Sequence, residues 1–265
     1  MRLPITIFLV FTALTVAVTG FWESAAESIF PSTVWGLYSR SFFENVLVEA
    51  HGTIVDLFVV GVLLYWFEKR RSTKEEILRN HEILGDLRSY RGPDCSFRTL
   101  GTVRRLLELG VIKLHLSEMA FNDLEIKDLQ LKECNLHAVL FTNSRLQHVV
   151  FDACNCDAAI FAGSKLEHVA ANRSSFRRAK FQDATLKGMD FTSCQIEAAN
   201  FTNANLRSSN FRGVDCRGVN FHNADLRSVN FIGAQHLTCQ MLAIAKSIQA
   251  LKSDDPKIQA LVSAA

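Results

Sequence analysis

An apolar residue at every fifth position from Val111 to Phe231 restricts the fold of this chain more than any other feature. The series covers 25 consecutive centres without an exception. A second apolar or small residue stands two places before each centre, as at Ala159, Ala179 and Ala199. A helix repeats every 3.6 residues and a strand every two, so neither element fits. The spacing therefore predicts a chain that turns a corner every five residues, with two side chains inward and three outward.

Two segments show the complete repeat, Ala204-Asn205-Leu206-Arg207-Ser208 and Ala224-Asp225-Leu226-Arg227-Ser228. This pattern resembles the pentapeptide-repeat family, whose consensus is A-(D/N)-L-x-x. Two apolar segments before the repeat and the stretch 104–110 are similar to membrane-anchored, two-span members of that family. The resemblance implies a mainly β fold: a right-handed quadrilateral β-helix over 111–237, with four pentapeptides per coil and about six coils. An α-helical transmembrane hairpin and short capping helices would precede it.

Four pentapeptides per coil would place centres 20 residues apart on one face. The first face then holds only phenylalanines: Phe121, Phe141, Phe161, Phe181, Phe201 and Phe221. The second holds Ile126 followed by Leu146, Leu166, Leu186, Leu206 and Leu226. The third holds Leu131, Phe151, Ala171, Phe191, Phe211 and Phe231, and the fourth holds Leu116, Leu136, Cys156, Phe176, Ile196 and Cys216. Coils stacked about 4.8 Å apart would make Phe and Leu ladders the core.

Polar residues and flanking helices complete this prediction. Asn or Asp recurs just before the centres, where its side chain can bond turn backbone: Asp190, Asn200, Asn205, Asn210, Asp215, Asn220, Asp225 and Asn230. We expect a helix over Phe97 to Leu109, ended by Gly110, to cover the first coil. A helix over 237–250, within a C-terminal cap and tail at 238–265, is expected to close the other end.

The N-terminal 68 residues contain two apolar segments, about 3–22 and 46–67, each long enough to cross a bilayer as a helix. A cleaved signal peptide is the alternative for the first segment. The second ends in Tyr65-Trp66 and the basic cluster Lys69-Arg70-Arg71, which marks the cytoplasmic side. Residues 69–110 are expected to form a cytoplasmic helical connector, with a helix beginning near Thr73. We expect a multi-pass protein of a bacterial inner membrane, with the repeat domain in the cytoplasm.

Glu49, Thr53 and Asp56 would share one face of the second span. Ionisable groups at membrane depth suggest an ion or proton path. The alternative is a helix-packing or oligomer face whose polar groups pair between helices.

The remaining polar groups indicate little chemistry. Five cysteines, Cys134, Cys154, Cys156, Cys194 and Cys216, fall at inward positions and are expected to be buried thiols. His148 and His168 would stack, and no third metal ligand is evident.

Within 111–236, 14 Lys or Arg residues oppose 13 Asp or Glu residues. Some members of the family mimic duplex DNA, which requires an acidic surface that this repeat lacks, and the cationic column of Lys187, Arg207 and Arg227 is a weak DNA-binding signal.

Leu140, Val150 and Ile160 are apolar at positions that should face outward, and Leu140 and Ile160 are adjacent rungs of one column. They predict a contact surface for a protein partner or another copy, or else a site packed by the connector.

We therefore expect a non-catalytic scaffold or protein-interaction module, anchored in the membrane. The alternative is a channel or transport-related protein in which the polar face of the second span is functional and the β-helix serves assembly. No nucleophile–base pair, phosphate loop or metal-ligand spacing supports an enzyme. Expected partners are membrane lipids and an unidentified protein or self-association. We expect no cofactor, metal, nucleic acid or small-molecule substrate.

Overall fold

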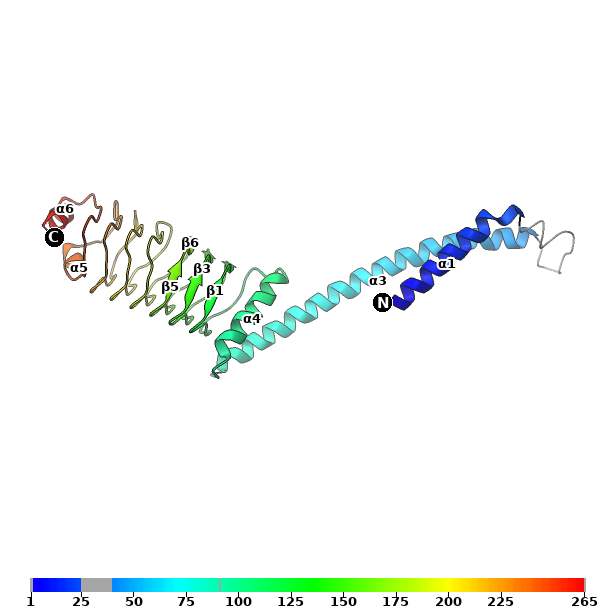
Figure 1. Cartoon of the computed structure of the whole chain (residues 1–265), viewed down its shortest axis with the longest axis horizontal. Helices are drawn as coiled ribbons and strands as arrows, with labels where there is room; N and C mark the ends of the chain where they lie inside the picture. The colour runs from blue at the N-terminus through cyan, green and yellow to red at the C-terminus, as the bar shows by residue number, and fades with distance from the viewer. Residues whose placement is uncertain (1, 25–39, 91, 265) are drawn as a thin grey trace. The chain divides into compact units, whose positions relative to one another are not determined.

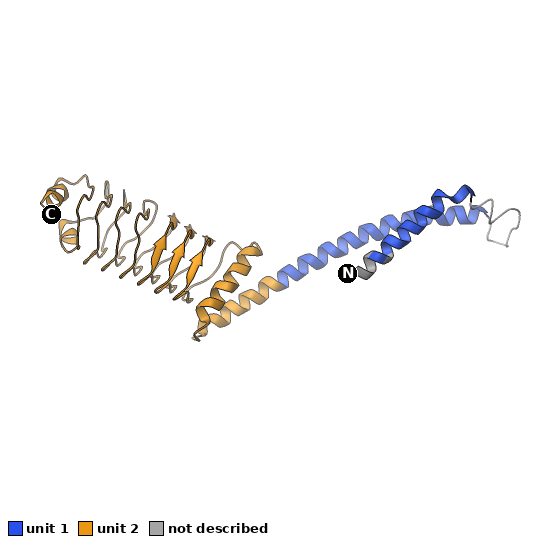
Figure 2. Cartoon of the chain, in the orientation of Figure 1, with its two compact units in different colours: residues 1–75 blue, residues 76–265 orange. Residues whose placement is uncertain are grey.

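The computed structural model describes residues 2–24, 40–90 and 92–264. These residues divide into two compact units, Met1–Glu75 and Glu76–Ala265, and the boundary falls inside one long helix (Figure 2). Most of the loop expected between the two apolar segments, residues 25–39, lies outside the described residues.

The first unit contains two helices that run antiparallel, α1 (Arg2–Gly20) and the first part of α3 (Arg40–Ser89) (Figure 1). The rings of Phe8 and Phe58 lie 6.5 Å apart near one end of the contact. Near the other end, Trp22 lies 6.4 Å from the Phe43 ring and donates a hydrogen bond of 3.3 Å to Glu44. Contacts between the two antiparallel segments therefore lie at Phe8 within α1 and at Trp22, just after the end of that helix.

The helix start expected near Thr73 is wrong, because α3 continues without a break from Arg40 to Ser89. The Thr73 hydroxyl donates to the Lys69 carbonyl at 3.0 Å, which is a bond of the helix interior and not a cap. Arg71 and Glu75 form an i,i+4 ion pair of 2.8 Å across the expected boundary. A capping sequence cannot start a helix where the preceding residues are already helical.

The expected helix before the repeat is confirmed as α4 (Cys95–Glu108). It begins two residues earlier than predicted. Gly110 follows it with a left-handed φ of 83°, and its N–H bonds to the Leu107 carbonyl. Val103 and Leu106 are fully buried and belong to one core with Leu84 at the end of α3 and with the first coil. The helix α4 thus covers the end of the solenoid next to β1 (Figure 1).

Residues 20 apart pair in parallel throughout the repeat, which confirms four pentapeptides per coil. Three strands pair along the second face: β1 (Glu125–Lys127), β3 (Arg145–Gln147) and β5 (Lys165–Glu167). Three others pair along the third face: β2 (Gln130–Lys132), β4 (Val150–Asp152) and β6 (Ala170–Asn172). Isolated bridges such as Ile160 with Lys180 and Asn210 with Asn230 continue the same register.

Every centre from Leu116 to Phe231 is buried, and Val111 packs partly buried against the same core. Successive rings of the first face stack with centroids 4.9 to 5.7 Å apart. Rings of the third face meet them edge-on, as Phe191 meets Phe201 at 80°. Both geometries are favourable for aromatic pairs. The predicted Phe ladder is therefore the core of the solenoid.

Ala171 interrupts the phenylalanines of the third face, and a ring from the fourth face fills the gap. Phe176 lies 6.1 Å from Phe151 and 6.4 Å from Phe191, the rings one coil below and one coil above Ala171. In the sequence these two residues fall on separate faces with no evident relation, whereas in the core the large ring of Phe176 compensates for the small side chain of Ala171.

The corners of the coil use left-handed backbone. The second residue after each centre has a positive φ at nearly every turn, for example 57° at Asn143 and 68° at Gly163. The predicted role of the eight Asn and Asp residues before the centres is confirmed, because each accepts a hydrogen bond from the N–H two residues later. These bonds measure 2.9 to 3.3 Å.

The helix expected over 237–250 is wrong. Only α5 (Cys239–Ala243) forms there, and the chain then makes one more partial coil, in which Ser247 bridges Asp225 and Lys252 bridges Asn230. Ile248 and Leu251 are buried with the spacing that Leu226 and Val229 show one coil earlier. The five-residue series resumes there after a shift of register, and α6 (Pro256–Ser263) follows it.

Candidate interaction surfaces

The structure separates the three outward apolar residues predicted as one contact surface. Leu140 and Ile160 bridge each other on adjacent coils of the first face. Val150 lies in β4 on the third face, which is the opposite wall of the coil. The prediction of one surface is therefore wrong, and only Leu140 and Ile160 can contact the same partner.

Four alanines extend the pair Leu140 and Ile160 into an apolar area that the sequence analysis missed. Each is only partly exposed and lies on the first face or at its corner. We call the six residues the first-face patch: Ala120, Ala138, Leu140, Ala158, Ile160 and Ala162. The signal was present in the sequence, since five of the six residues fall in two columns with a spacing of 20, at positions 120, 140 and 160 and at positions 138 and 158.

Charged side chains stand at the two ends of the first-face patch. Glu118 is one coil below Ala138, Arg178 is one coil above Ala158, and Lys180 bridges Ile160 from the coil above. All three are exposed, and none has an ion-pair partner within the described residues. The patch thus has an acidic end and a basic end.

The other faces differ because their charges are mostly paired between or within coils. Arg145 bonds to Glu167 at 2.9 Å on the second face, and Arg173 bonds to Asp152 at 2.7 Å near the third. The Arg145 guanidinium holds the pKa of Glu167 below its ordinary value. Within the described residues, no ion pair lies on the first face. Its charges are therefore available to a partner.

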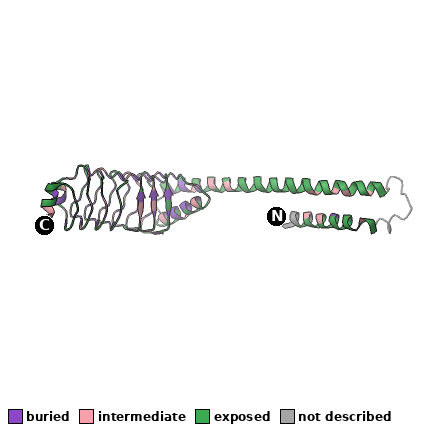
Figure 3. Cartoon of the chain, turned by 90° about the horizontal axis from the view of Figure 1, so that it is seen from above, coloured by how far each residue is buried: buried purple, intermediate pink, exposed green. Residues whose placement is uncertain are grey.

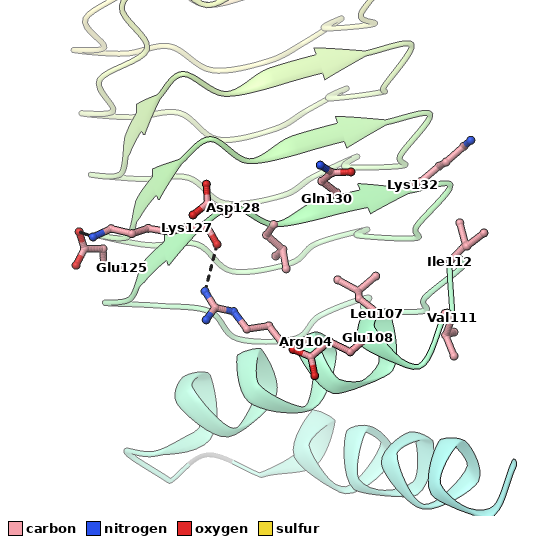
Figure 4. Close-up of a pocket in the computed structure, with 12 residues that line it drawn as sticks. Arg104, Leu107, Glu108, Val111, Ile112, Glu125, Lys127, Asp128, Gln130 and Lys132 are labelled. Atoms are coloured by element: carbon pink, nitrogen blue, oxygen red, sulfur yellow. Dashed lines mark hydrogen bonds and ion pairs between the residues drawn. The ribbon is translucent and has the colours of Figure 1, made fainter. Parts of the chain in front are cut away.

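An open groove of about 850 Å³ lies between α4 and the first coil (Figure 4). The Arg104 guanidinium crosses it and donates a hydrogen bond of 3.2 Å to the Lys127 carbonyl. Leu107 and Ile112 contribute an apolar wall, and Ile112 is 54% exposed. The groove mixes apolar and oppositely charged groups, and nothing in the sequence pattern predicted it.

The predicted polar residues of the second span, Glu49, Thr53 and Asp56, share one side of α3. Thr53 donates to the Glu49 carbonyl at 2.9 Å, which satisfies its hydroxyl inside the helix. Glu49 and Asp56 are both exposed in the single chain. Asp56 lies midway between Val46 and Phe67, the ends of the apolar stretch. An ionisable group at that depth requires water or a polar partner.

Among the described helices, α3 alone is long and apolar enough to cross a membrane, by length and composition. The segment Phe8–Gly20 of α1 is apolar but shorter.

The thiols and imidazoles lie where the repeat places them. The five inward cysteines are buried, and burial raises the pKa of Cys194 to about 11 and that of Cys216 to about 12. The rings of His148 and His168 stack with centroids 5.0 Å apart. Across 2–24, 40–90 and 92–264, no three His, Cys, Asp or Glu side chains are grouped to hold a metal ion.

Comparison with known proteins identifies the repeat. The family model described as pentapeptide repeat region matches residues 112–181 and 172–237. Among curated proteins, no sequence matches this chain.

Three solved structures show what kinds of protein this chain is similar to. Trypsin-treated QnrB1, a plasmid-mediated fluoroquinolone resistance protein, has 16% identity and a TM-score of 0.42, over 57% of this chain and 79% of QnrB1. A pentapeptide repeat protein of the Arabidopsis thaliana thylakoid lumen has 23% identity and a TM-score of 0.30, over 44% and 68% of the two chains. HetL, involved in heterocyst differentiation regulation in Nostoc sp., has 16% identity and a TM-score of 0.23, over 59% and 96%. Sequence identities and TM-scores this low do not show that this chain shares a function with any of these proteins.

Proposed function

We propose that this protein is a membrane-anchored, non-catalytic scaffold. Its residues 112–237, which match the pentapeptide repeat region, would present a rigid solenoid to a protein partner. The observation that carries the proposal is the combination of a fully packed repeat core with a long apolar helix whose side chains are largely exposed in the same chain.

The exposed apolar side chains of α3 support the anchor. Val55, Leu64 and Phe67 are 61%, 63% and 59% exposed, and most of the segment around them is exposed (Figure 3). The 22 residues from Val46 to Phe67 extend about 33 Å as a helix, which matches a hydrocarbon core of about 30 Å. Leaving such a surface in water is unfavourable by about 25 cal/mol for each Å² of apolar area. A bilayer would cover it.

The end of this stretch supports a cytoplasmic repeat domain. The Arg70 guanidinium lies 5.0 Å from the Trp66 ring centroid, so an interfacial aromatic residue carries a cation on the headgroup side. Lys69, Arg71 and Lys74 add positive charge on the same side. Basic residues are retained on the cytoplasmic side of bacterial inner membranes. In this proposal α1 is a second span, retained beside α3, and membrane lipids surround both.

The solenoid supports the scaffold role. Its interior is filled by side chains, and its outward surface is fixed by the stacked coils, so a partner would meet a preformed shape. The first-face patch and the groove beside α4 are the surfaces on which such contact is proposed.

Fractionation with vesicles of defined orientation tests the anchor. The protein should stay in the pellet after alkaline carbonate extraction, and a Val55→Asp/Leu64→Asp variant should be released into the supernatant. Protease added to inside-out vesicles should digest residues 76–265, whereas right-side-out vesicles should protect them. Release of the wild-type chain by carbonate would refute the anchor, and protection in inside-out vesicles would refute the orientation.

A further inference from the structure

The first-face patch combines apolar side chains with unpaired charges of opposite sign at its two ends. We infer that this patch binds a second copy of the same chain, with the two solenoids antiparallel and their first faces in contact. The inference does not depend on the membrane anchor, because every residue that carries it lies between 118 and 183.

The order of residues along the columns fits a two-fold axis. Place that axis between the coils of Leu140 and Ile160, along the strand direction. Each column then faces the same column of the second copy in reverse order, as an isologous interface requires. Leu140 lies opposite Ile160 of the second copy, and Ala138 lies opposite its Ala158. Ala120 lies opposite Lys180 of the second copy and Ala162 lies opposite its Thr142, so the apolar contact is centred on the other four patch residues.

The same axis pairs the charges. Glu118 lies opposite Arg178 of the second copy, with Lys180 of that copy in the neighbouring column. The symmetry makes this contact twice. Complementary charges at the rim of an interface fix register and exclude wrong orientations. When this column faces the same column of the second copy, Glu118 and Arg178 meet opposite charges only if the two solenoids run in opposite directions.

The opposite corner of the first face opposes this attraction in part. Asp123 and Asp183 would face each other there, but each accepts a hydrogen bond from an amide of its own column. Asn143 donates to Asp123 at 3.3 Å, and Asn203 donates to Asp183 at 2.9 Å. These bonds hold the two carboxylates along the corner of their own solenoid. A parallel pair would instead place Glu118 opposite Asp123, Arg178 opposite Asp183 and Lys180 opposite its own copy, so the lysine contact makes it the less favourable arrangement.

The size of the patch indicates a weak dimer. Four coils cover about 15 Å along the solenoid and one pentapeptide is about 15 Å wide, so the contact is a few hundred Å² on each chain. Stable complexes bury about 800 Å² on each partner. We therefore expect reversible association that depends on protein concentration and weakens as salt increases.

Two single charge reversals give a decisive test. The full chain in detergent micelles is labelled in separate donor and acceptor pools, and energy transfer is followed on dilution. Glu118→Arg alone and Arg178→Glu alone each place like charges opposite one another twice, so each should bind itself about tenfold more weakly. Mixing the two variants places an arginine opposite a glutamate at both contacts. The mixture should therefore recover the wild-type dissociation constant.

Lys187→Glu is the matched control, because Lys187 is an exposed cation on the second face and should leave association unchanged. Ile160→Lys should abolish association in every combination. Three results would overturn the inference: a wild-type chain that stays monomeric at all concentrations, charge reversals that leave association unchanged, or a mixture no stronger than the single variants. A monomeric wild-type chain would mean that the patch binds a different protein. A mixture no stronger than the single variants would exclude the antiparallel arrangement.

Discussion

Exchanging Phe176 and Ala171 tests whether a large side chain on one face of the solenoid compensates for a small side chain on the neighbouring face. Phe176 contacts four rings, those of Phe151, Phe161, Phe181 and Phe191, at centroid distances of 6.0 to 6.4 Å. Replacing a buried Phe with Ala costs about 3–5 kcal/mol. We place Phe176→Ala at the upper end of that range, because lost aromatic pairs add about 0.5–1.5 kcal/mol each.

The compensating change has its own cost. Ala171→Phe alone adds a ring where the Phe176 ring already lies, so overpacking should destabilise the coil by about 1–3 kcal/mol. In the double variant the new ring at 171 would stack between Phe151 and Phe191, in the space that Phe176 leaves. With about 5 kcal/mol for Phe176→Ala, the sum of the single effects is about 6–8 kcal/mol, whereas we expect the double variant to lose only about 1–3 kcal/mol relative to wild type.

Hydrogen exchange of the full chain, measured by mass spectrometry on peptides from residues 151–196, reports the opening free energy of these coils. Phe231→Ala is the control. The ring of Phe231 stacks on Phe211 and meets Phe221 edge-on, and these are its two ring contacts within the described part of the chain. This substitution should cost less than Phe176→Ala and should affect only the last coils. A double variant as unstable as the sum of its parts would show that Phe176 does not fill the gap beside Ala171.

Three further predictions follow from the polar groups. Cys239 is the one cysteine that is partly exposed, so a thiol reagent should modify one of the seven thiols quickly and the others only after unfolding. Arg227 donates to Asp225 at 2.8 Å and lowers the pKa of that carboxyl, so Asp225 stabilises the fold above about pH 4 and loses this effect as pH falls through its lowered pKa. Asp225→Asn should therefore lower the melting temperature at pH 7 and have little effect at pH 2, and an equal effect at both would contradict this. Reconstituted protein should leave bilayers silent, and an ion flux abolished by Asp56→Asn would favour the channel hypothesis over the scaffold.

The repeat could be predicted almost completely from the sequence, because the residues that set its five-residue period are the same residues that form its core. A centre that must point inward every fifth residue fixes both where the chain turns and what it buries. The Phe and Leu faces, the buried thiols and the Asx bonds at the corners were all confirmed for that reason. The left-handed backbone at Ala138 and Ala158, with φ of 52° and 57°, follows from the same geometry although alanine has no preference for it.

The errors arose where a local pattern competes with its surroundings. Ser72 and Thr73 have the composition of a helix start, but helix propagation from the apolar segment costs less than a new nucleus, so α3 continues through them. Ile248 and Leu251 have helical spacing, yet the exposed edge of the last coil offers backbone partners that a helix would leave unpaired. In both places the neighbouring structure, which the sequence window does not contain, decides the outcome.

The misplacement of Val150 is of a different kind, because the information needed was already in the numbering. With four pentapeptides per coil, ten residues are half a coil, so Leu140 and Val150 must face opposite directions. Twenty residues are a whole coil, so Leu140 and Ile160 must stack, as their bridge shows. The same arithmetic places Glu118 and Arg178 three coils apart in one column. An interaction surface on this solenoid is therefore defined by columns and corners, and a self-complementary one requires opposite charges at equal distances from its centre.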